Sequence, residues 1–253
     1  MASAAAVEDV PDGDDEDAED GDPDGADGKA DGRNLRDGSW QGPGGLVLTP
    51  EQNRLVSTHM ARVTAFEPAV TAMVRTLADS AGSGRLVGLQ YRVKSEHSLK
   101  RRIALSLLRH PVRTAEEVLD HGYDALRYTL CAEPEHYASC VERALERLLE
   151  LGLASARFRN FWRESGGEYR GVNTVWQGPP RRRMFELQFH TPDSYRATVV
   201  THTAYERLRQ PGLTDDTAAG LRALQSAVFG RVPVPPAARA IALPPAPPGA
   251  ERS

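Results

Sequence analysis

Apolar residues recur at helical or strand spacing between about residue 49 and residue 230. The longest helical pattern begins with Thr49 as a cap and Pro50 in the first turn, and it continues to about Ser80. Pro68 lies inside this pattern and could kink the helix. The apolar positions that predict its buried face are Leu55, Met60, Val63, Phe66, Val70, Met73, Val74 and Leu77.

Shorter patterns follow. The apolar run at 86–89 predicts a buried strand, and Ile103, Leu105, Leu107 and Leu108 predict a helix capped by Ser95 or Ser98. The remaining elements are expected as strands over 125–131, 154–158, 172–177 and 183–190 and helices over 134–151, 192–210 and 215–229. In the last helix we expect Leu221, Leu224 and Val228 to point inward. The pattern therefore predicts an α+β fold with a mixed β-sheet flanked by helices.

Charge is distributed unevenly along the chain. Residues 1–32 hold 13 of the 35 acidic residues and one of the 31 basic ones, leaving the rest with a net charge of +8. The acidic, Gly- and Ala-rich leader has little to bury, so we expect residues 1–48 to be disordered. The Pro-rich end over 231–253 is also expected to be disordered, which leaves one domain over 49–230. A body with a charge of +8 favours an anionic partner, although the charge could serve solubility alone.

Composition excludes several classes of protein. No apolar run is long enough to span a membrane, and the N-terminus lacks the basic and apolar regions of a signal peptide, so we expect a cytoplasmic protein. Cys131 and Cys140 are too few for a disulfide framework and are not spaced as a metal-binding pair. They could form one disulfide only if the protein is exported, which the sequence leaves open.

A cluster of cations surrounds the start of the helix that follows residue 95. It reads Arg92-Val-Lys94-Ser-Glu-His-Ser98-Leu-Lys100-Arg101-Arg102. Backbone N–H groups at a helix N-terminus favour phosphate oxygens, and Arg and Lys supply the charge that a triphosphate needs. We interpret the stretch as a polyphosphate-binding motif. The alternative interpretation is a solvated basic helix face.

Two other regions carry residues suited to nucleotide chemistry. Residues 157–173 mix cations, aromatic residues and glycines, which is typical of a loop that contacts a nucleotide. The strand over 183–190 alternates apolar residues with Glu186, Gln188 and His190, which predicts one core face and one polar face.

A possible metal ligand precedes the strand over 125–131. Asp124 stands at the mouth of this strand, a common place for a magnesium ligand, and strand twist can bring it and Arg127 to one edge.

The order of four motifs resembles the synthetase domain of the RelA/SpoT-like nucleotide pyrophosphokinases, the alarmone synthetases. The resemblance covers roughly residues 55–210. The motifs are Arg92-x-Lys94-x-x-x-Ser98-x-x-x-Arg102, Glu168-Tyr169-Arg170-Gly171-Val172-Asn173, Glu186-Leu-Gln188-Phe-His190-Thr191 and His202-x-x-Tyr205. They resemble the family's donor-ATP motif, its acceptor loop, its catalytic Glu-x-Gln-x-Arg-Thr strand and the His-x-x-Tyr of the following helix.

The resemblance implies a nucleotidyltransferase-like fold and an enzyme that uses Mg²⁺, ATP and an acceptor nucleotide. Such an enzyme transfers the β,γ-pyrophosphate of ATP to the 3'-hydroxyl of the acceptor and releases AMP. Glu186 would be the general base and a magnesium ligand together with Asp124. The residues implied in ATP binding are Arg92, Lys94, Ser98, Arg102 and Arg127, and those on the acceptor side are Tyr169, Arg170, Asn173, Gln188 and His190, with Tyr169 stacking on the base.

Several positions depart from the family pattern. The family's metal-binding Asp usually lies five residues before the strand Arg, where this chain has Gly122, so Asp124 is our candidate and Asp120 the runner-up. Glu168, Asn173 and His190 replace the usual Gly, His and Arg, and Arg102 replaces a Lys.

We therefore expect a synthetase without a hydrolase domain and with relaxed acceptor choice. His202 either takes part in the site or is a buried, hydrogen-bonded residue. Two alternatives stay open: a toxin-type relative that depletes adenine nucleotides or modifies tRNA 3' ends, and a non-catalytic nucleotide- or RNA-binding module. The oligomeric state is not readable from the sequence.

Overall fold

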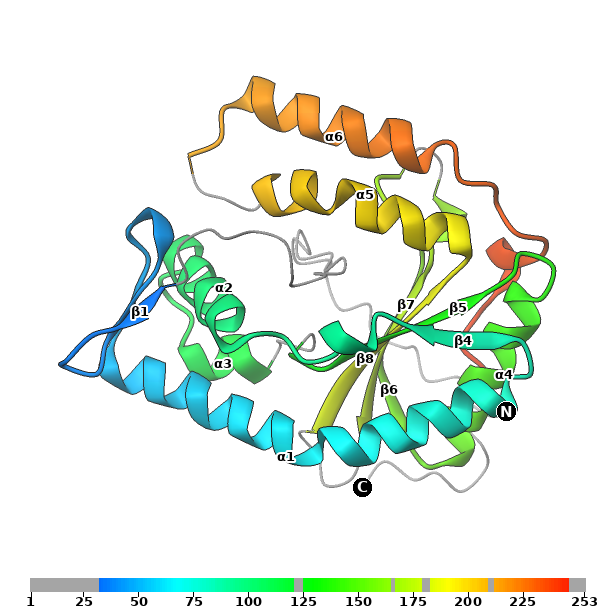
Figure 1. Cartoon of the computed structure of the whole chain (residues 1–253), viewed down its shortest axis with the longest axis horizontal. Helices are drawn as coiled ribbons and strands as arrows, with labels where there is room; N and C mark the ends of the chain where they lie inside the picture. The colour runs from blue at the N-terminus through cyan, green and yellow to red at the C-terminus, as the bar shows by residue number, and fades with distance from the viewer. Residues whose placement is uncertain (1–31, 121–124, 165–166, 179–182, 209–211, 246–253) are drawn as a thin grey trace, which may run out of the picture.

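The computed structural model describes residues 32–120, 125–164, 167–178, 183–208 and 212–245 (Figure 1). Its centre is a five-stranded sheet in the order β4-β5-β8-β7-β6. The strands are β4 (Gly84–Val87), β5 (Arg127–Ala132), β6 (Ala154–Asn160), β7 (Val172–Gly178) and β8 (Arg183–His190). β5 and β8 are parallel and the other pairs are antiparallel, so the sheet is mixed. The predicted α+β class is confirmed.

Six helices surround the sheet in the described part of the chain. They are α1 (Pro50–Ser80), α2 (Glu96–Arg109), α3 (Ala115–Asp120), α4 (Tyr137–Glu150), α5 (Pro192–Leu208) and α6 (Asp215–Phe229). Figure 1 shows α1 on one side of the sheet and the stacked pair α5 and α6 on the other. None of the described helices is long and apolar enough to cross a membrane.

The sheet has one apolar face and one polar face. The apolar face packs on α1 and α4, because the Tyr128 hydroxyl lies 2.7 Å from Thr71 Oγ1 on α1 and the Tyr137 hydroxyl on α4 donates to the Phe189 carbonyl at 2.8 Å. Its largest fully buried side chains include Trp176, Phe185 and Phe189. The opposite face turns toward α5, and it carries the polar residues of β5, β7 and β8 described below.

The predicted first helix is confirmed in detail. The Thr49 hydroxyl accepts from the Gln52 backbone N–H, and the Gln52 side chain accepts from the Thr49 N–H, which makes a capping box. The helix continues through Pro68 without a break. In α6, by contrast, Leu224 is exposed, and the buried residues are Gln225 and Phe229. The expectation that Leu224 points inward is therefore wrong.

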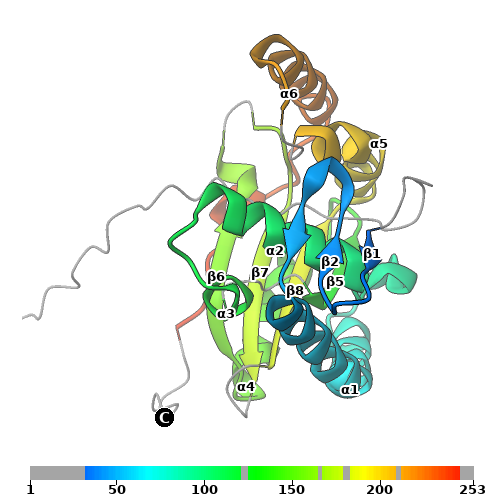
Figure 2. The same cartoon turned by 90° about the vertical axis from the view of Figure 1, so that its left-hand side faces the viewer.

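The predicted disordered leader is wrong for its last part. Residues 32–48 form a small antiparallel sheet of β1 (Arg33–Asn34), β2 (Trp40–Gln41) and β3 (Val47–Leu48), with a 3₁₀ turn η1 (Pro43–Gly45) between β2 and β3. Trp40 is fully buried, and its indole N–H donates to His97 of α2 at 3.4 Å. Figure 2 shows this sheet lying across α2. Trp40, together with the buried Leu46 and Leu48, therefore anchors a segment that is otherwise mostly polar and glycine-rich.

The Pro-rich end is also ordered in its first part, against expectation. Residues 231–245 run over the edge of the sheet, with the turn η5 (Ala238–Ala240) and with Ala238 and Ile241 fully buried. The Asn160 amide donates to the Ala238 and Ile241 carbonyls at 2.8 and 3.0 Å. Proline has no N–H to satisfy, so side chains of the sheet can hold such a segment by its carbonyls. Residues 1–31 and 246–253 lie outside the described part of the chain.

Candidate active site

The polar face of the sheet brings Arg127 and Glu186 to partner positions on neighbouring strands. In the parallel pairing of β5 and β8, Arg127 lies opposite Glu186 and Thr129 opposite Gln188, while Asn173 of β7 is the partner of Gln188 on its other side. Residues paired in register share a face of the sheet. The sequence motifs that resemble the catalytic strand and the acceptor loop therefore meet beside Arg127.

Glu186 is held in a defined position at this face. Its side chain is buried, and its Oε1 accepts from Gln188 Nε2 at 2.8 Å. Its backbone N–H donates to the Leu126 carbonyl at 2.8 Å, one residue before Arg127. A buried carboxylate is costly unless hydrogen bonds and nearby cations stabilise it, so Gln188 and Arg127 suit this environment.

The predicted polyphosphate motif lies beside the same strand. The Arg127 N–H donates to the Arg92 carbonyl at 2.8 Å, and the Lys94 N–H donates to the Ala125 carbonyl at 3.1 Å. An isolated antiparallel bridge joins Val93 to Leu126. Residues 92–94 thus form a short extension of the sheet next to Arg127, which places the predicted polyphosphate motif and Glu186 at one edge.

The start of α2 is capped as expected. Ser95 is the N-cap, and its hydroxyl accepts from the Ser98 N–H at 3.1 Å. Arg102 follows one turn later and is partly exposed. The helix begins directly after Lys94, so its N-terminal N–H groups lie next to the cations of the motif.

Arg92, before this helix, and Lys100, within it, each pair with a carboxylate. Arg92 Nε donates to Glu67 Oε1 at 2.5 Å, and this hydrogen bond lowers the pKa of Glu67 and raises that of Arg92. Lys100 is almost fully buried and pairs with Glu96 at 2.6 Å. Lys100 Nζ also lies 3.2 Å from Asn34 Oδ1 of β1, so it fixes the helix to the N-terminal sheet.

The predicted metal ligands are only partly described. Asp124 lies outside the described residues, so its role stays a prediction. Asp120, the runner-up, ends α3 and is exposed. Among the described residues, no group of three or more His, Cys, Asp or Glu side chains is arranged to hold a metal ion.

The acceptor side contains a buried hydrogen-bonded relay. The Tyr169 hydroxyl donates to Asn173 Oδ1 at 2.7 Å and lies 2.8 Å from His190 Nε2, while His190 Nδ1 lies 2.9 Å from Ser194 Oγ. All four side chains are buried. Each ring nitrogen of His190 therefore has one hydroxyl partner, Tyr169 at Nε2 and Ser194 at Nδ1.

His190 is therefore a neutral histidine in this relay. Its pKa is lowered to about 3, chiefly because burial disfavours the charged ring; the nearby positive charge of Arg127 acts in the same direction, and a hydrogen bond with the Arg170 backbone acts against both. His190 thus contributes no positive charge at neutral pH.

Tyr169 and Arg170 lie differently from the sequence expectation. The Tyr169 ring is 3% exposed and packs edge-on against Phe161 at 4.9 Å and against His190 at 5.3 Å between ring centroids. The structure therefore presents no open face of Tyr169 to a base. Arg170 is also buried, and its Nη1 donates to the Glu164 carbonyl at 3.0 Å. It holds the turn that follows β6.

The remaining candidates are simple to place. His202 lies on α5 and is partly buried. Cys131 and Cys140 are both free and buried, and burial raises the pKa of both thiols, that of Cys131 to about 11. Neither thiol is therefore an activated nucleophile.

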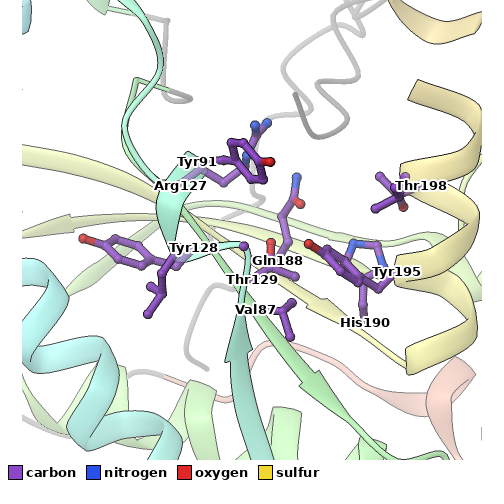
Figure 3. Close-up of a pocket in the computed structure, with 12 residues that line it drawn as sticks. Val87, Tyr91, Arg127, Tyr128, Thr129, Gln188, His190, Tyr195 and Thr198 are labelled. Atoms are coloured by element: carbon purple, nitrogen blue, oxygen red, sulfur yellow. The ribbon is translucent and has the colours of Figure 1, made fainter. Parts of the chain in front are cut away.

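A pocket opens between the polar face of the sheet and α5 (Figure 3). The predicted residues Arg127, Gln188 and His190 line it. Its other lining residues are Val87, Gly88, Leu89, Tyr91, Tyr128, Thr129, Tyr195, Thr198 and Val199. The sequence reasoning missed Tyr91, although it directly precedes the motif that begins at Arg92. It also missed Tyr195 and Thr198, whose spacing of three places them on one side of a helix.

The comparisons with known proteins concern structure only. No family model matches the chain, and no curated protein matches its sequence. The fold is similar to that of the small alarmone synthetase 1 from Bacillus subtilis bound to its product pppGpp. The two sequences are 14% identical, the match covers 71% of this chain and 91% of that chain, and the TM-score is 0.43.

Two further solved structures are similar to a comparable degree. A GTP pyrophosphokinase family protein from Streptococcus pneumoniae gives 14% identity, coverage of 72% and 90%, and a TM-score of 0.44. The small alarmone synthetase 2 from Bacillus subtilis gives 13% identity, coverage of 69% and 96%, and a TM-score of 0.45.

Proposed function

We propose that the chain is a nucleotide 3'-pyrophosphokinase that transfers the β,γ-pyrophosphate of ATP to a purine nucleotide and releases AMP. The observation that carries this proposal is the pairing of Arg127 with Glu186 on adjacent parallel strands, with residues 92–94 hydrogen-bonded alongside. A nucleic-acid-binding module gains nothing from a buried carboxylate beside its cations, because phosphate repels it. A phosphoryl-transfer enzyme needs a base at this position.

In the proposed reaction the 3'-oxygen of the acceptor attacks the β-phosphorus of ATP. The bond between that phosphorus and the oxygen bridging to the α-phosphate breaks, and AMP leaves with the bridging oxygen. Glu186 would accept the proton of the 3'-hydroxyl. Gln188, which donates to Glu186 Oε1 at 2.8 Å, would orient the carboxylate for this step.

The cations would neutralise the triphosphate and the charge that develops during transfer, which is the main contribution of the protein in this kind of reaction. Arg127 and Lys94 lie on the bridged segments next to Glu186, and Arg102 lies on α2. Arg92 is oriented by Glu67 and by the Leu89 carbonyl, to which its Nη1 donates at 2.8 Å. Ser98 would meet phosphate at the helix N-terminus.

Magnesium would be held by Glu186 and Asp124. Two carboxylates are ligands of the type that Mg²⁺ prefers, because this ion is usually bound by one or two carboxylates, by phosphate oxygens and by water. When bound, the ion would offset charge on the pyrophosphate group. On the acceptor side, Asn173 Oδ1 accepts from Tyr169, which leaves one acceptor fewer for reading a base, and we expect relaxed choice among purine nucleotides.

The direct test is the release of AMP from ATP labelled in the adenine ring, with Mg²⁺ and GDP, GTP, ADP or ATP as acceptor. Glu186→Gln should lower turnover by more than about a hundredfold and leave ATP affinity within a few fold, because the base acts in the transition state. The control is Glu150→Gln on α4, where an exposed carboxylate pairs with Arg147.

The outcomes separate the alternatives. Equal turnover in Glu186→Gln and the wild type would remove Glu186 from its role. Failure of the wild type to form a product with any acceptor, together with tight RNA binding, would favour the non-catalytic module. In a competition between equimolar GTP and ATP as acceptors, a preference for guanine above about a thousandfold would refute relaxed choice.

A further inference from the structure

Two tyrosines that belong to none of the sequence motifs face the pocket from opposite elements. Tyr91 lies in the 3₁₀ turn η2 (Leu89–Tyr91), and Tyr195 lies in the first turns of α5. Both side chains line the pocket and are partly exposed. Figure 3 shows the Gln188 side chain projecting between them, with Thr198 on the α5 side. The pocket therefore has aromatic surface on two sides and polar groups around it.

Gly88 keeps the space between the two rings open. Its backbone is left-handed, with φ of 65°, and a Cβ at this position would lie 3.0 Å from Tyr195 Oη and 3.8 Å from Tyr91 Cδ2. Both tyrosines thus approach the same glycine, and no side chain at residue 88 separates them. Tyr195 is also fixed on its inner side, because its ring packs on His190 at a centroid distance of 6.2 Å and an angle of 63°.

The polar groups of the pocket suit a flat heteroaromatic ligand with an attached anion. Gln188 Nε2 is used by Glu186, which leaves the amide oxygen as the atom that can accept from a base. Thr129 and Thr198 add hydroxyl groups, and Arg127 supplies a positive charge at the same pocket. Neutral, buried His190 closes one side and adds no charge.

We propose that this pocket binds the base of a nucleotide, with Tyr195 and Tyr91 as the stacking residues and Gln188 as a hydrogen-bond acceptor. The proposal rests on the function proposed above and deepens it, because the aromatic residue expected to stack, Tyr169, is buried in the relay. Stacking on tyrosine is tolerant of base identity, since every base has a π-face. Donor ATP and the acceptor nucleotide share this chemistry, so the experiment must distinguish them.

The test measures, by calorimetry, the affinity of the full-length protein for three probes. They are a non-hydrolysable ATP analogue, GDP, and inorganic tripolyphosphate, which has no base. Tyr195→Ala should weaken binding of one nucleotide or both by about 5- to 100-fold and leave tripolyphosphate binding unchanged. Tyr195→Phe should keep nucleotide affinity within about twofold, because the π-face remains. The matched control is Val200→Ala, an exposed position on the same helix.

Tyr91→Ala tests the opposite wall and serves as the second variant if Tyr195→Ala does not fold. Weakening of the ATP analogue alone assigns the pocket to the donor base, and weakening of GDP alone assigns it to the acceptor. Unchanged affinity for both nucleotides in a folded Tyr195→Ala or Tyr91→Ala protein would overturn the inference. AMP release by the wild type is measured separately, so a failure of the pocket and a failure of the proposed activity are distinguishable.

Discussion

Replacing His190 with Gln should remove a specific acid sensitivity of the fold. In the folded protein the imidazole is fully buried between Tyr169 and Ser194, and burial lowers its pKa to about 3 from an ordinary value of 6.5. The unfolded chain takes up a proton near pH 6.5, whereas the folded chain does not until about pH 3. Acidification through this window therefore favours unfolding. Glutamine can donate to Tyr169 but does not titrate.

The size of the effect follows from the difference between the two pKa values. A pH of 5 is about 1.5 units below the pKa of His190 in the unfolded chain. The free energy of unfolding should therefore be about 2 kcal/mol lower at pH 5 than at pH 8. Urea unfolding followed by tryptophan fluorescence at pH 5, 6, 7 and 8 measures this for the wild type and His190→Gln. Other groups titrate in both proteins, so the quantity of interest is the difference between the two free energies of unfolding. A difference that is constant from pH 8 to pH 5 would refute the neutral, buried histidine.

Three further substitutions test the packing around the site. Trp40→Ala should lower the free energy of unfolding by about 3–5 kcal/mol, measured in urea, because it empties a fully buried site that anchors the N-terminal sheet to α2. Asn160→Ala should cost about 1–3 kcal/mol and speed proteolysis within residues 231–245, because the Ala238 carbonyl loses its side-chain donor and the Ile241 carbonyl keeps only Arg163. Arg101→Ala should cost less than about 1 kcal/mol by thermal denaturation, because the ion pair with Glu206 is partly exposed.

The sequence was informative wherever a periodic pattern coincided with a capping residue. Thr49 and Ser95 cap α1 and α2 as expected, and the strands over 172–177 and 183–190 are present as a hairpin in the register Val172 to Phe189. Local propensity and tertiary packing favour the same structure in these elements, so the sequence of each segment is enough to predict its secondary structure. The meeting of Arg127, Glu186 and the motif at Arg92 followed from the order of the motifs.

The two ends of the domain could not be predicted because their stability comes from contacts distant in sequence. Residues 32–48 are mostly polar and rich in glycine, and what orders them is the burial of Trp40, Leu46 and Leu48, with Trp40 inserted beside α2. Residues 231–245 are held by Asn160, about eighty positions earlier in the chain. The composition of a segment indicates how much apolar surface it has to bury. It does not indicate whether another part of the chain provides a site in which that surface is buried.

The altered acceptor motif has a physical explanation in the buried relay. The side chain at position 190 has no exposure to solvent and lies near Arg127, so a guanidinium there would be a buried cation beside another cation. A neutral imidazole avoids that cost and joins Ser194 of α5 to Tyr169 and Asn173. Once the Tyr169 hydroxyl and ring are used in this way, its ring no longer offers an open face for a base. We therefore expect a base to stack on Tyr195 instead of Tyr169; the binding experiment above tests this expectation, and the pH experiment separately tests the neutral state of His190.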